Sequence, residues 1–367
     1  MLRVLHVFKT YPPDSFTGIE RVIHAIATGC AQYRIASSVL TVSPRGAATV
    51  EFDGHEVHTV PLSFNLGSTP IAAALPARLR QLATEQDIIH YHHPWPMADI
   101  AHLIARPETP AILTYHSDIV RQRFMGLFYS PLMYRHLRSM KRVIATSPNY
   151  RDSSAVLQRL EREVEVVPIG LDAPSAPADP RVLAYWRERC GGPFFLFLGV
   201  LRYYKGLDYL VEAARLSGLP VVIAGSGPEE ARLKRSSEGL GNVQFIGQVG
   251  EADKGALIES ATALVLPSHL RSEAYGVVLV EASMRGRPLI TAEIGTGTSF
   301  VNQDGESGIS VPPRDPVAIA TAMRRLWEDA VLARRLGDGA KRRHAKMLTG
   351  AQMARRYAAI YNAVASV

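Results

Sequence analysis

The sequence predicts an α/β protein built from two Rossmann-like, doubly wound domains that face each other across a cleft. Three observations predict this fold. Apolar, β-branched runs alternate with helix-like stretches, which is typical of parallel sheets covered by helices on both faces. The length of 367 residues favours two domains, because a single core rarely grows beyond about 250–300 residues. A stretch rich in proline and small residues, 170–181, separates two series of strands.

The strands of each domain are expected where the apolar runs occur. In the first half these are Leu2–Phe8, Ser38–Val42, Glu56–Val60, Ile88–Tyr91, Ala111–His116, Val143–Ser147 and Val164–Ile169. In the second half they are Phe194–Gly199, Pro220–Ala224, Val243–Gly247, Ala263–Pro267, Pro288–Thr291 and Ile309–Val311. We therefore place one domain at 1–172, a second at 173–345, and a C-terminal helix at 346–367 that packs back on the first domain. Ligands of such sheets bind at the carboxyl ends of the strands, so functional residues are expected there.

The composition is that of a globular protein, with 47% hydrophobic and 20% charged residues and a mean hydropathy of +0.02. No apolar run reaches the ~20 residues of a membrane span. The N-terminus lacks the apolar core and cleavage site of a signal peptide. Cys30 and Cys190 lie far apart without metal-like spacing and are interpreted as free thiols. A cytoplasmic location is expected.

The formal net charge of +7 is concentrated in one segment, Ile119 to Arg151, which has no acidic residue. Its seven basic residues are Arg121, Arg123, Arg135, Arg138, Lys141, Arg142 and Arg151. Apolar residues interleave with them, namely Phe124, Leu127, Phe128, Leu132, Met133 and Leu137. The segment is either an ordinary amphipathic helix with a solvated basic face, or a surface that docks on an anionic membrane leaflet.

Two cations follow the first strand of the second half, in "FLGVLRYYKG". Arg202 and Lys205 stand in a turn at the carboxyl end of that strand and suit a diphosphate, although a solvated loop is the alternative. The next strand leads into "AGSGPEEARL", where Gly225, Ser226 and Gly227 permit close backbone approach to a ligand. The third glycine of a dinucleotide fingerprint is replaced by Glu230, so NAD binding is disfavoured.

The stretch "LRSEAYGVVLVEASMRG" contains two glutamates, Glu273 and Glu281. Gly276 is expected to open a helix whose first N–H groups, including that of Val277, can bind a phosphate. Glu281 lies in an apolar run, where a carboxylate needs a partner. It could accept hydroxyl groups of a ribose, with Glu273 contacting a sugar. The alternative is an i, i+4 ion pair between Glu281 and Arg285.

Histidines mark the first half of the chain. His116 ends the strand in "LTYHSDIV" and is a catalytic candidate, although a lone histidine is more often structural. The segment "IIHYHHPWPMAD" holds His90, His92 and His93, where a metal is conceivable but carboxylate or cysteine ligands are missing. We favour an acceptor-side wall, with Trp95 available to stack on a sugar. No Asp-x-Asp motif occurs in the sequence, so no metal ligand set is expected.

Together these motifs resemble the retaining glycosyltransferases of the GT-B type, in family four. The resemblance covers nearly the whole chain and rests on "SEAYGVVLVEA", "KGLDYLVEA", "AGSGPEEARL" and "DGESGISVPPRDP". "GVLRYYKG" and "EIGTGTSFVNQDGESG" are similar to bacterial O-antigen mannosyl- and D-rhamnosyltransferases that use GDP-sugars. The resemblance implies hexose transfer from GDP-mannose or GDP-D-rhamnose to a lipid-linked oligosaccharide at the inner face of the membrane. It implies no metal, no further cofactor and no nucleic-acid partner. UDP-sugar transfer, or a non-catalytic nucleotide-sugar binder or epimerase-like protein, are the alternatives.

The resemblance also implies roles for single residues. Glu273 and His116 contact the donor sugar, Glu281 binds the nucleoside ribose, and Lys205 and Arg202 hold the diphosphate. The remaining donor-binding positions are Gly18, Gly225, Ser226, Tyr275, Gly276 and Val277, with His92 and Trp95 on the acceptor side. Two departures stand out: Val200 occupies the slot of the family's arginine, and Thr17 precedes Gly18 where paired glycines are usual. The implied mechanism is front-face substitution with retention, in which the leaving diphosphate helps to deprotonate the acceptor.

Overall fold

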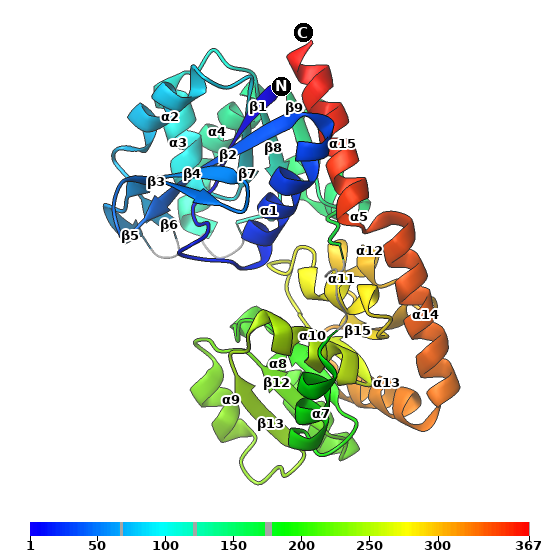
Figure 1. The fold of residues 1–367 in the computed structure, drawn as a ribbon. Helices are drawn as coiled ribbons and strands as arrows, with labels where there is room; N and C mark the ends of the chain where they lie inside the picture. Colours follow the sequence, from blue (N-terminus) through cyan, green and yellow to red (C-terminus); the bar gives the residue numbers. More distant parts are fainter. Residues whose placement is uncertain (67–68, 120–122, 173–177, 367) are drawn as a thin grey trace. The chain divides into compact units, whose positions relative to one another are not determined.

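The computed structural model describes residues 1–66, 69–119, 123–172 and 178–366 (Figure 1). The chain folds into two compact units, each described here by itself. Unit 1 comprises Met1–Leu171 together with Gly350–Val367, and unit 2 comprises Asp172–Thr349. Each unit is an α/β layer structure around its own sheet.

Unit 1 is built on an eight-stranded sheet in the order β10-β9-β8-β7-β1-β2-β4-β3. The strands are β1 (Leu2–Val7), β2 (Ile35–Ser43), β3 (Ala48–Phe52), β4 (His55–Pro61), β7 (Ile88–His93), β8 (Ala111–Tyr115), β9 (Arg142–Ala145) and β10 (Glu165–Val166). All neighbours are parallel except β3 and β4, which are antiparallel. A two-stranded hairpin of β5 (Phe64–Leu66) and β6 (Thr69–Ile71) lies outside this sheet.

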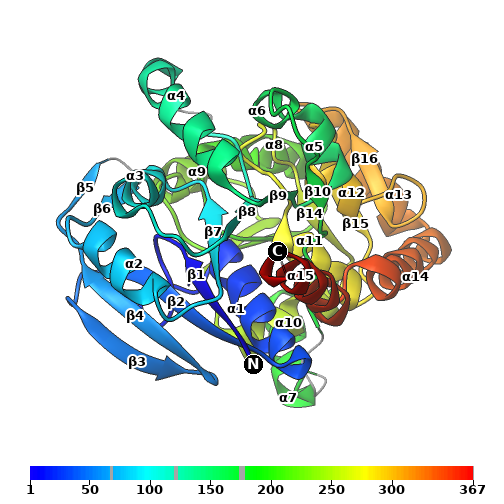
Figure 2. The same cartoon turned by 90° about the horizontal axis from the view of Figure 1, so that it is seen from above.

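The helices of unit 1 lie on both faces of the sheet (Figure 2). α1 (Gly18–Cys30) packs against α15 (Gly350–Ala365) on one face, while α2 (Leu75–Ala83), α3 (Pro96–Ala105) and the second half of α4 (Arg123–Ser139) cover the other. The shorter helices are η1 (Ala31–Tyr33), α5 (Pro148–Ser153) and α6 (Ala155–Gln158). Right-handed crossovers on either side of β1 place α1 and α3 on opposite faces, as the handedness rule requires.

Unit 2 has a six-stranded, wholly parallel sheet in the order β13-β12-β11-β14-β15-β16. Its strands are β11 (Phe195–Leu198), β12 (Val221–Ala224), β13 (Val243–Gly247), β14 (Ala263–Leu266), β15 (Leu289–Ala292) and β16 (Gly308–Val311). Its helices are α7 (Pro180–Arg189), η2 (Tyr203–Lys205), α8 (Leu207–Ser217), α9 (Glu230–Ser236), α10 (Glu251–Ser260), α11 (Val277–Met284), α12 (Gly297–Val301), α13 (Pro316–Glu328) and α14 (Ala330–Met347).

The central strands are buried on both faces, which explains their continuous apolar sequences. β14 and β15 are buried at every position, and so is β7, although β7 reads Ile-Ile-His-Tyr-His-His. Three histidines in a fully buried strand need hydrogen-bond partners, because an unpaired buried polar group is costly. β7 is therefore the strand of unit 1 whose sequence differs most from the apolar sequence of an ordinary buried strand.

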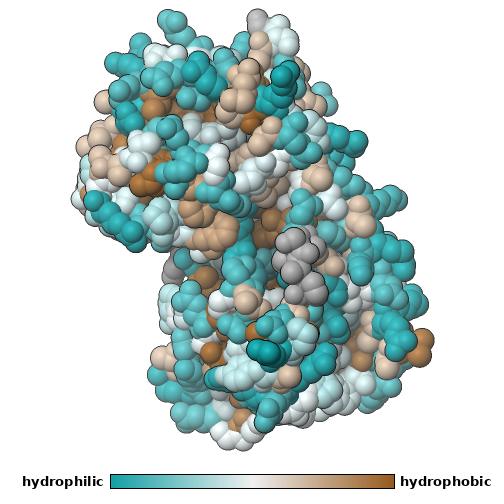
Figure 3. Space-filling view, viewed as in Figure 1, coloured by the Kyte–Doolittle hydropathy of each residue, from teal (hydrophilic) through white to brown (hydrophobic). Residues whose placement is uncertain are grey.

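The outer surface carries few large apolar side chains. On the face shown in Figure 3, hydrophobic residues form small separate patches among hydrophilic ones. Within the described part of the chain, no helix combines the length and apolar content needed to cross a bilayer. Cys30 and Cys190 are both buried and free, and burial raises the pKa of the Cys30 thiol to about 12.

Candidate active site

Each sheet has one point at which the winding direction reverses. In unit 2 the chain moves outward from β11 to β12 and β13, then returns to β14 on the other side of β11. In unit 1 the equivalent pair is β1 and β7. The loops that leave neighbouring strands at such a point diverge, and ligands of open α/β sheets bind there. The predicted site residues come from these loops.

In unit 2, Lys205 and Glu273 form an ion pair between the loops that follow β11 and β14. Both side chains are nearly buried, at 12% and 10% exposure. Ser268 Oγ also donates to Glu273 Oε2, at 3.3 Å. Burial alone would lower the pKa of Lys205, but the neighbouring Glu273 carboxylate reverses this effect and raises it. The structure thus presents a fixed ammonium and a fixed carboxylate at the switch point.

The loop that carries Lys205 lies against the turn after β12. Leu201 N donates to Ser226 O at 2.9 Å, and Gly199 N donates to Ala224 O at 3.0 Å. Gly225 has a φ of 132°, and a Cβ there would lie 2.0 Å from the Gly199 carbonyl oxygen. Only glycine fits this close approach. Arg202 and Ser226 are exposed beside it.

α11 begins at Val277, directly after Gly276, whose φ of 74° is left-handed. A Cβ at Gly276 would lie within 2.9 Å of both Leu279 and Leu266 side chains, so the helix entry needs glycine. The first N–H groups of a helix lack intrahelical acceptors, which leaves those of α11 suited to an anion. The preceding side chain, Tyr275, is 4% exposed.

Glu281 lies in the second turn of α11, and its carboxylate is paired with Lys254 of α10. Lys254 Nζ lies 2.5 Å from Glu281 Oε1 and 3.0 Å from a carboxylate oxygen of Glu251. The alternative partner, Arg285, instead pairs with Glu259 at 3.4 Å and donates to the Glu281 backbone carbonyl. The i, i+4 ion pair is therefore wrong: Lys254 pairs with the Glu281 carboxylate, while the Arg285 guanidinium contacts the Glu281 backbone carbonyl and the Glu259 carboxylate.

The loop after β15 supports the Glu273 segment, which the sequence did not indicate. Thr296 Oγ1 donates to Glu273 O at 2.8 Å, and Gly297 N donates to Ala274 O at 2.8 Å. The signal available in the sequence was the Gly-Thr-Gly-Thr run at 295–298, which permits such a close backbone contact.

In unit 1, Gly18 is the first residue of α1 and follows the β1 loop. Glu20 in the first turn is 3% exposed and accepts three hydroxyl hydrogen bonds from that loop. They come from Thr10 at 2.7 Å, Ser15 at 2.9 Å and Thr17 at 2.7 Å. A carboxylate near a helix N-terminus is also favoured by the helix dipole. Glu20 therefore fixes the loop around Gly18, a role that sequence reasoning missed.

His116, just beyond β8, lies at the end of a row of buried imidazoles. Its Nε2 lies 3.0 Å from His92 Nδ1, and His92 Nε2 lies 3.1 Å from His6 Nδ1. The three rings are 4%, 2% and 0% exposed. His90 stands beside them, with its two nitrogens 2.7 Å from Tyr361 Oη and Thr114 Oγ1. The structure therefore brings His92 and His116 together, and adds His6.

Trp95 does not offer the stacking face that the sequence suggested. Its ring is 1% exposed, and Nε1 donates to Pro70 O of the β5–β6 hairpin at 3.0 Å. The hairpin could not be expected from the sequence because its strands have only three residues each. It covers the indole, so stacking of a sugar on Trp95 is contradicted.

One group of His, Cys, Asp and Glu side chains among the described residues is close enough to hold a metal ion. It consists of His6, His90 and His92, whose ligand atoms lie within 4.8 Å of one another. Both nitrogens of His90 and both of His92 already have hydrogen-bond partners. An ion would have to displace these bonds, so the donor set does not favour a metal.

The basic segment is divided by the structure. Met133, His136 and Leu137 of α4 are buried, so two of its apolar residues belong to the core. Arg135 and Arg138 face outward from the same helix. Arg142 and Arg151 have acidic partners, Glu165 and Asp152. Arg121 lies outside the described residues, as do the side chains of Arg123, Phe124, Leu127 and Phe128.

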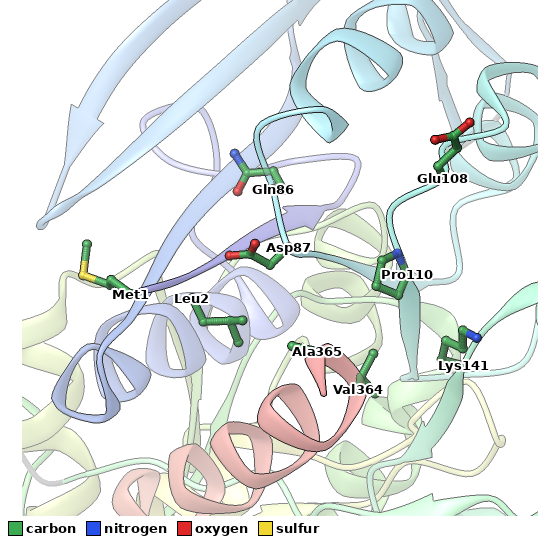
Figure 4. Close-up of a pocket in the computed structure, with 9 residues that line it drawn as sticks. All are labelled: Met1, Leu2, Gln86, Asp87, Glu108, Pro110, Lys141, Val364 and Ala365. Atoms are coloured by element: carbon green, nitrogen blue, oxygen red, sulfur yellow. The ribbon is translucent and has the colours of Figure 1, made fainter. Parts of the chain in front are cut away.

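A cavity of about 700 Å³ occurs in unit 1, away from these residues (Figure 4). Its lining includes Leu2, Asp87, Pro110 and Lys141, which lie at or just before the amino ends of β1, β7, β8 and β9. Substrates of doubly wound sheets bind at the opposite, carboxyl edge. We therefore assign this cavity no part in the candidate active site.

Two family models match the chain in tandem. The model for Glycosyltransferase Family 4 matches residues 16–173, and that for Glycosyl transferases group 1 matches residues 186–343. The chain is also 44% identical to O-antigen chain mannosyltransferase C of Escherichia coli, over 98% of each protein. The chain belongs to the GT-B glycosyltransferases. The predictions of this family, of two Rossmann-like α/β units and of an enzyme that transfers a sugar are thereby confirmed.

Further similarities of this glycosyltransferase agree with that assignment. It is 44% identical to D-rhamnosyltransferase WbpZ of Pseudomonas aeruginosa, over 95% of this chain and 92% of the relative. Among solved structures, sucrose-phosphate synthase from Thermosynechococcus elongatus aligns over 100% of both chains, with a TM-score of 0.82 and 19% identity. At that identity the match concerns the fold of the glycosyltransferase alone.

Proposed function

We propose that this glycosyltransferase moves mannose or D-rhamnose from a GDP-sugar to a lipid-linked saccharide during O-antigen synthesis. The observation that carries the proposal is the 44% identity, over nearly the full chain, to an O-antigen chain mannosyltransferase and a D-rhamnosyltransferase. Both relatives transfer a hexose by name. We further propose that the reaction proceeds with retention and without a bound divalent metal.

Unit 2 is proposed to bind the donor. An ammonium group has three donors, so Lys205 can keep Glu273 while it donates to a diphosphate oxygen. Arg202 is exposed on the same loop and can add a second cation. Gly225, Ser226 and the N-terminus of α11, with Tyr275, Gly276 and Val277, provide close backbone contacts. Their convergence at the switch point of one sheet supports this assignment.

The two glutamates are proposed to recognise the two ends of the donor. Glu281, held by Lys254, accepts the ribose hydroxyls, and Glu273, held by Lys205, accepts a hydroxyl of the sugar. A buried carboxylate with a fixed partner is oriented without losing further side-chain freedom on binding. His116 and Gly18 of unit 1 are proposed to contact the donor sugar and the diphosphate.

The proposed chemistry needs little from protein acids and bases. The acceptor hydroxyl oxygen forms the new bond to the anomeric carbon on the face from which the diphosphate leaves. The diphosphate takes the bonding electron pair and the hydroxyl proton. Catalysis then rests on positioning and on neutralising the departing diphosphate by Lys205 and Arg202.

Donor choice can be tested directly. Thermal unfolding is measured with GDP, UDP and ADP, followed by transfer assays with GDP-mannose, GDP-D-rhamnose and UDP-glucose in excess chelator. We expect GDP alone to raise the melting temperature, because only a ligand of the native state stabilises it. Stabilisation by UDP with transfer from UDP-glucose contradicts the donor, and activity that returns only with magnesium contradicts the metal-free reaction. Binding without transfer to any saccharide extract contradicts the catalytic role.

The protein is also proposed to dock on the inner face of the cytoplasmic membrane, where a lipid-linked acceptor is presented. Arg135 and Arg138 point outward from α4, whose opposite side packs on α3. Each basic residue near an anionic surface contributes on the order of 1 kcal/mol, screened by salt. The described residues of the basic segment support such a surface through these two side chains.

Sedimentation with anionic vesicles tests the docking surface. We expect the protein to pellet with phosphatidylglycerol vesicles at low salt and to be released at high salt. Arg135→Ser/Arg138→Ser should weaken this binding, whereas Arg355→Ser/Arg356→Ser removes the same charge from exposed positions of α15 and serves as the matched control. Equal losses in both variants, or wild-type protein that stays in the supernatant at low salt, contradict a specific surface at α4.

A further inference from the structure

The row His6, His92 and His116 is a linear hydrogen-bonded chain with two open ends. Its two links are His6 Nδ1 to His92 Nε2 at 3.1 Å and His92 Nδ1 to His116 Nε2 at 3.0 Å. The rings of His6 and His92, and of His92 and His116, are stacked with an interplanar angle of 23°. Within the described structure, His6 Nε2 and His116 Nδ1 are buried without a hydrogen-bond partner. Each end of this row of histidines therefore has one ring nitrogen without a hydrogen-bond partner.

All three rings are neutral at physiological pH. Burial lowers the pKa of His6 and of His116 to about 3, and neighbouring histidines add to the effect. The pKa of His92 lies well below its ordinary value for the same reasons. A neutral imidazole has one N–H donor and one acceptor nitrogen. Each ring in the chain must therefore donate on one side and accept on the other.

This requirement allows two proton arrangements that keep both links. In the first, His6 donates to His92, His92 donates to His116, and the proton of His116 is on Nδ1. In the second, every bond is reversed, His116 Nδ1 is an acceptor, and the proton of His6 is on Nε2. The tautomers of the three residues are thus coupled, and the state of His116 depends on a residue two links away.

The two arrangements differ in what they leave unpaired when a ligand is bound. His116 lies beyond the carboxyl end of β8, at the edge where ligands of this type of sheet bind, so its buried, unpartnered Nδ1 is the end of the row that lies toward that edge. His6 is 0% exposed within β1, so its Nε2 stays unpaired. The first arrangement leaves an acceptor at His6, whereas the second leaves an N–H donor. Orphaned buried N–H groups are the rarer and more costly case.

We propose that His6 and His92 are positioning residues that hold His116 in the Nδ1–H tautomer, so that His116 donates a hydrogen bond to an acceptor oxygen of the bound nucleotide-sugar. This inference rests on the proposed function for the identity of the ligand, and on the histidine chain for the tautomer. A phosphate oxygen accepts and never donates, and a sugar hydroxyl can accept, so either oxygen fits. A ligand group that only donates does not fit.

The tautomer can be read without any substrate. In protein labelled with ¹⁵N-histidine, we expect His116 to show a protonated Nδ1 and an unprotonated Nε2. His92→Phe keeps the ring shape but removes both links, so this pattern should be lost. His92→Gln restores an acceptor for His6 and a donor for His116, so the pattern should return. His93→Phe is the matched control, because His93 is the next residue of β7 and neither of its nitrogens has a hydrogen-bond partner among the described residues.

Kinetic measurements then distinguish a positioning role of His6 and His92 from a purely structural role. His92→Phe and His6→Phe should lower kcat/KM about tenfold, the size of effect expected for one misdirected hydrogen bond, and His92→Gln should recover most of that loss. A His116 with its proton on Nε2 in the wild-type protein overturns the proposal. So do equal losses in the Phe and Gln variants, and so does stoichiometric zinc on the purified protein that His6→Phe removes. If His116 shows the expected tautomer but the protein binds no nucleotide, the result supports the hydrogen-bonded row of histidines and contradicts the proposed function instead.

Discussion

Lys205 and Glu273 meet as a nearly buried ion pair although they belong to different βα loops of unit 2. Removing one partner of a buried pair leaves an uncompensated charge, which typically costs about 3–5 kcal/mol. The same two residues are proposed to hold the donor. The pair therefore couples the stability of unit 2 to its binding site.

Replacing Lys205 should affect both properties, and a double variant can separate them. Lys205→Met is expected to lower the free energy of unfolding by about 3–5 kcal/mol because Glu273 loses its counter-ion. Lys205→Met/Glu273→Leu should recover most of that stability without recovering GDP affinity. Urea unfolding and calorimetric titration with GDP measure the two effects. If Lys205→Met is as stable as the wild type and binds GDP equally well, Lys205 has neither role.

Glu281 and Glu273 should differ in kinetic effect. Glu281→Gln is expected to raise the Kd for GDP about tenfold, because a charge-assisted hydrogen bond to the ribose is weakened. Glu273→Gln should mainly lower kcat. Lys254→Met removes the cation that pairs with Glu281 but leaves the Glu281 carboxylate in place. If Lys254→Met impairs GDP binding as much as Glu281→Gln, the ion pair rather than the ribose contact explains the loss.

Buried histidines should make the protein sensitive to acid. Folding lowers the pKa of His93 to about 4 and of His116 to about 3. The unfolded chain takes up these protons near pH 6.5, whereas the folded chain does so only below about pH 4. Stability is therefore complete above pH 6.5 and is lost as the pH falls from 6.5 toward 3, at up to about 1.4 kcal/mol per pH unit for each histidine. Urea unfolding between pH 8 and 4.5 should show that the free energy of unfolding decreases as the pH falls. His93→Phe should make this slope shallower by the contribution of one proton. A free energy of unfolding that does not change over this pH range contradicts the conclusion that these histidines are buried in their neutral form.

The close contact at Gly225 predicts that adding a single methyl group at this position strongly destabilises the protein. Gly225→Ala combines a positive φ with a Cβ 2.0 Å from a backbone oxygen, so a loss of at least about 2 kcal/mol is expected. Gly241 has open space around its Cβ position, and Gly241→Ala should change stability by less than about 0.5 kcal/mol. Thermal unfolding of both variants provides the comparison. Similar melting temperatures contradict the argument.

The strands of the parallel sheets could be predicted because burial on both faces requires continuous apolar runs, as in β14 and β15. β3 was missed for the opposite reason. Four of its five residues are exposed, so its sequence carries no burial signal, and it joins β4 antiparallel at the sheet edge. The expected parallel arrangement does not extend to this edge strand, whereas every pair of neighbouring strands in the sheet of unit 2 is parallel.

The contacts of the candidate site could also be predicted only in part, because they join residues that are distant in the sequence. Glu281 in an apolar run indicates that a partner exists, but Lys254 lies 27 residues away on another helix, and helical spacing pointed to Arg285 instead. The alternation of His90 and His92 in β7 places them on one face of the sheet. Their alignment with His6 and His116 depends on the register of three strands, which no local pattern contains.

α15 gives unit 1 an unusual order of assembly during synthesis. Its Tyr357 and Tyr361 bond Thr114 and His90, and Ala354 O accepts from Cys30 Sγ. These contacts belong to unit 1, yet α15 leaves the ribosome only after all of unit 2 has been made. At 5–20 residues per second, that delay is roughly ten seconds or more. During this interval unit 2 can fold as a contiguous segment, while the sheet of unit 1 still exposes the apolar face that α15 covers. Unit 1 is therefore begun before unit 2 and completed after it.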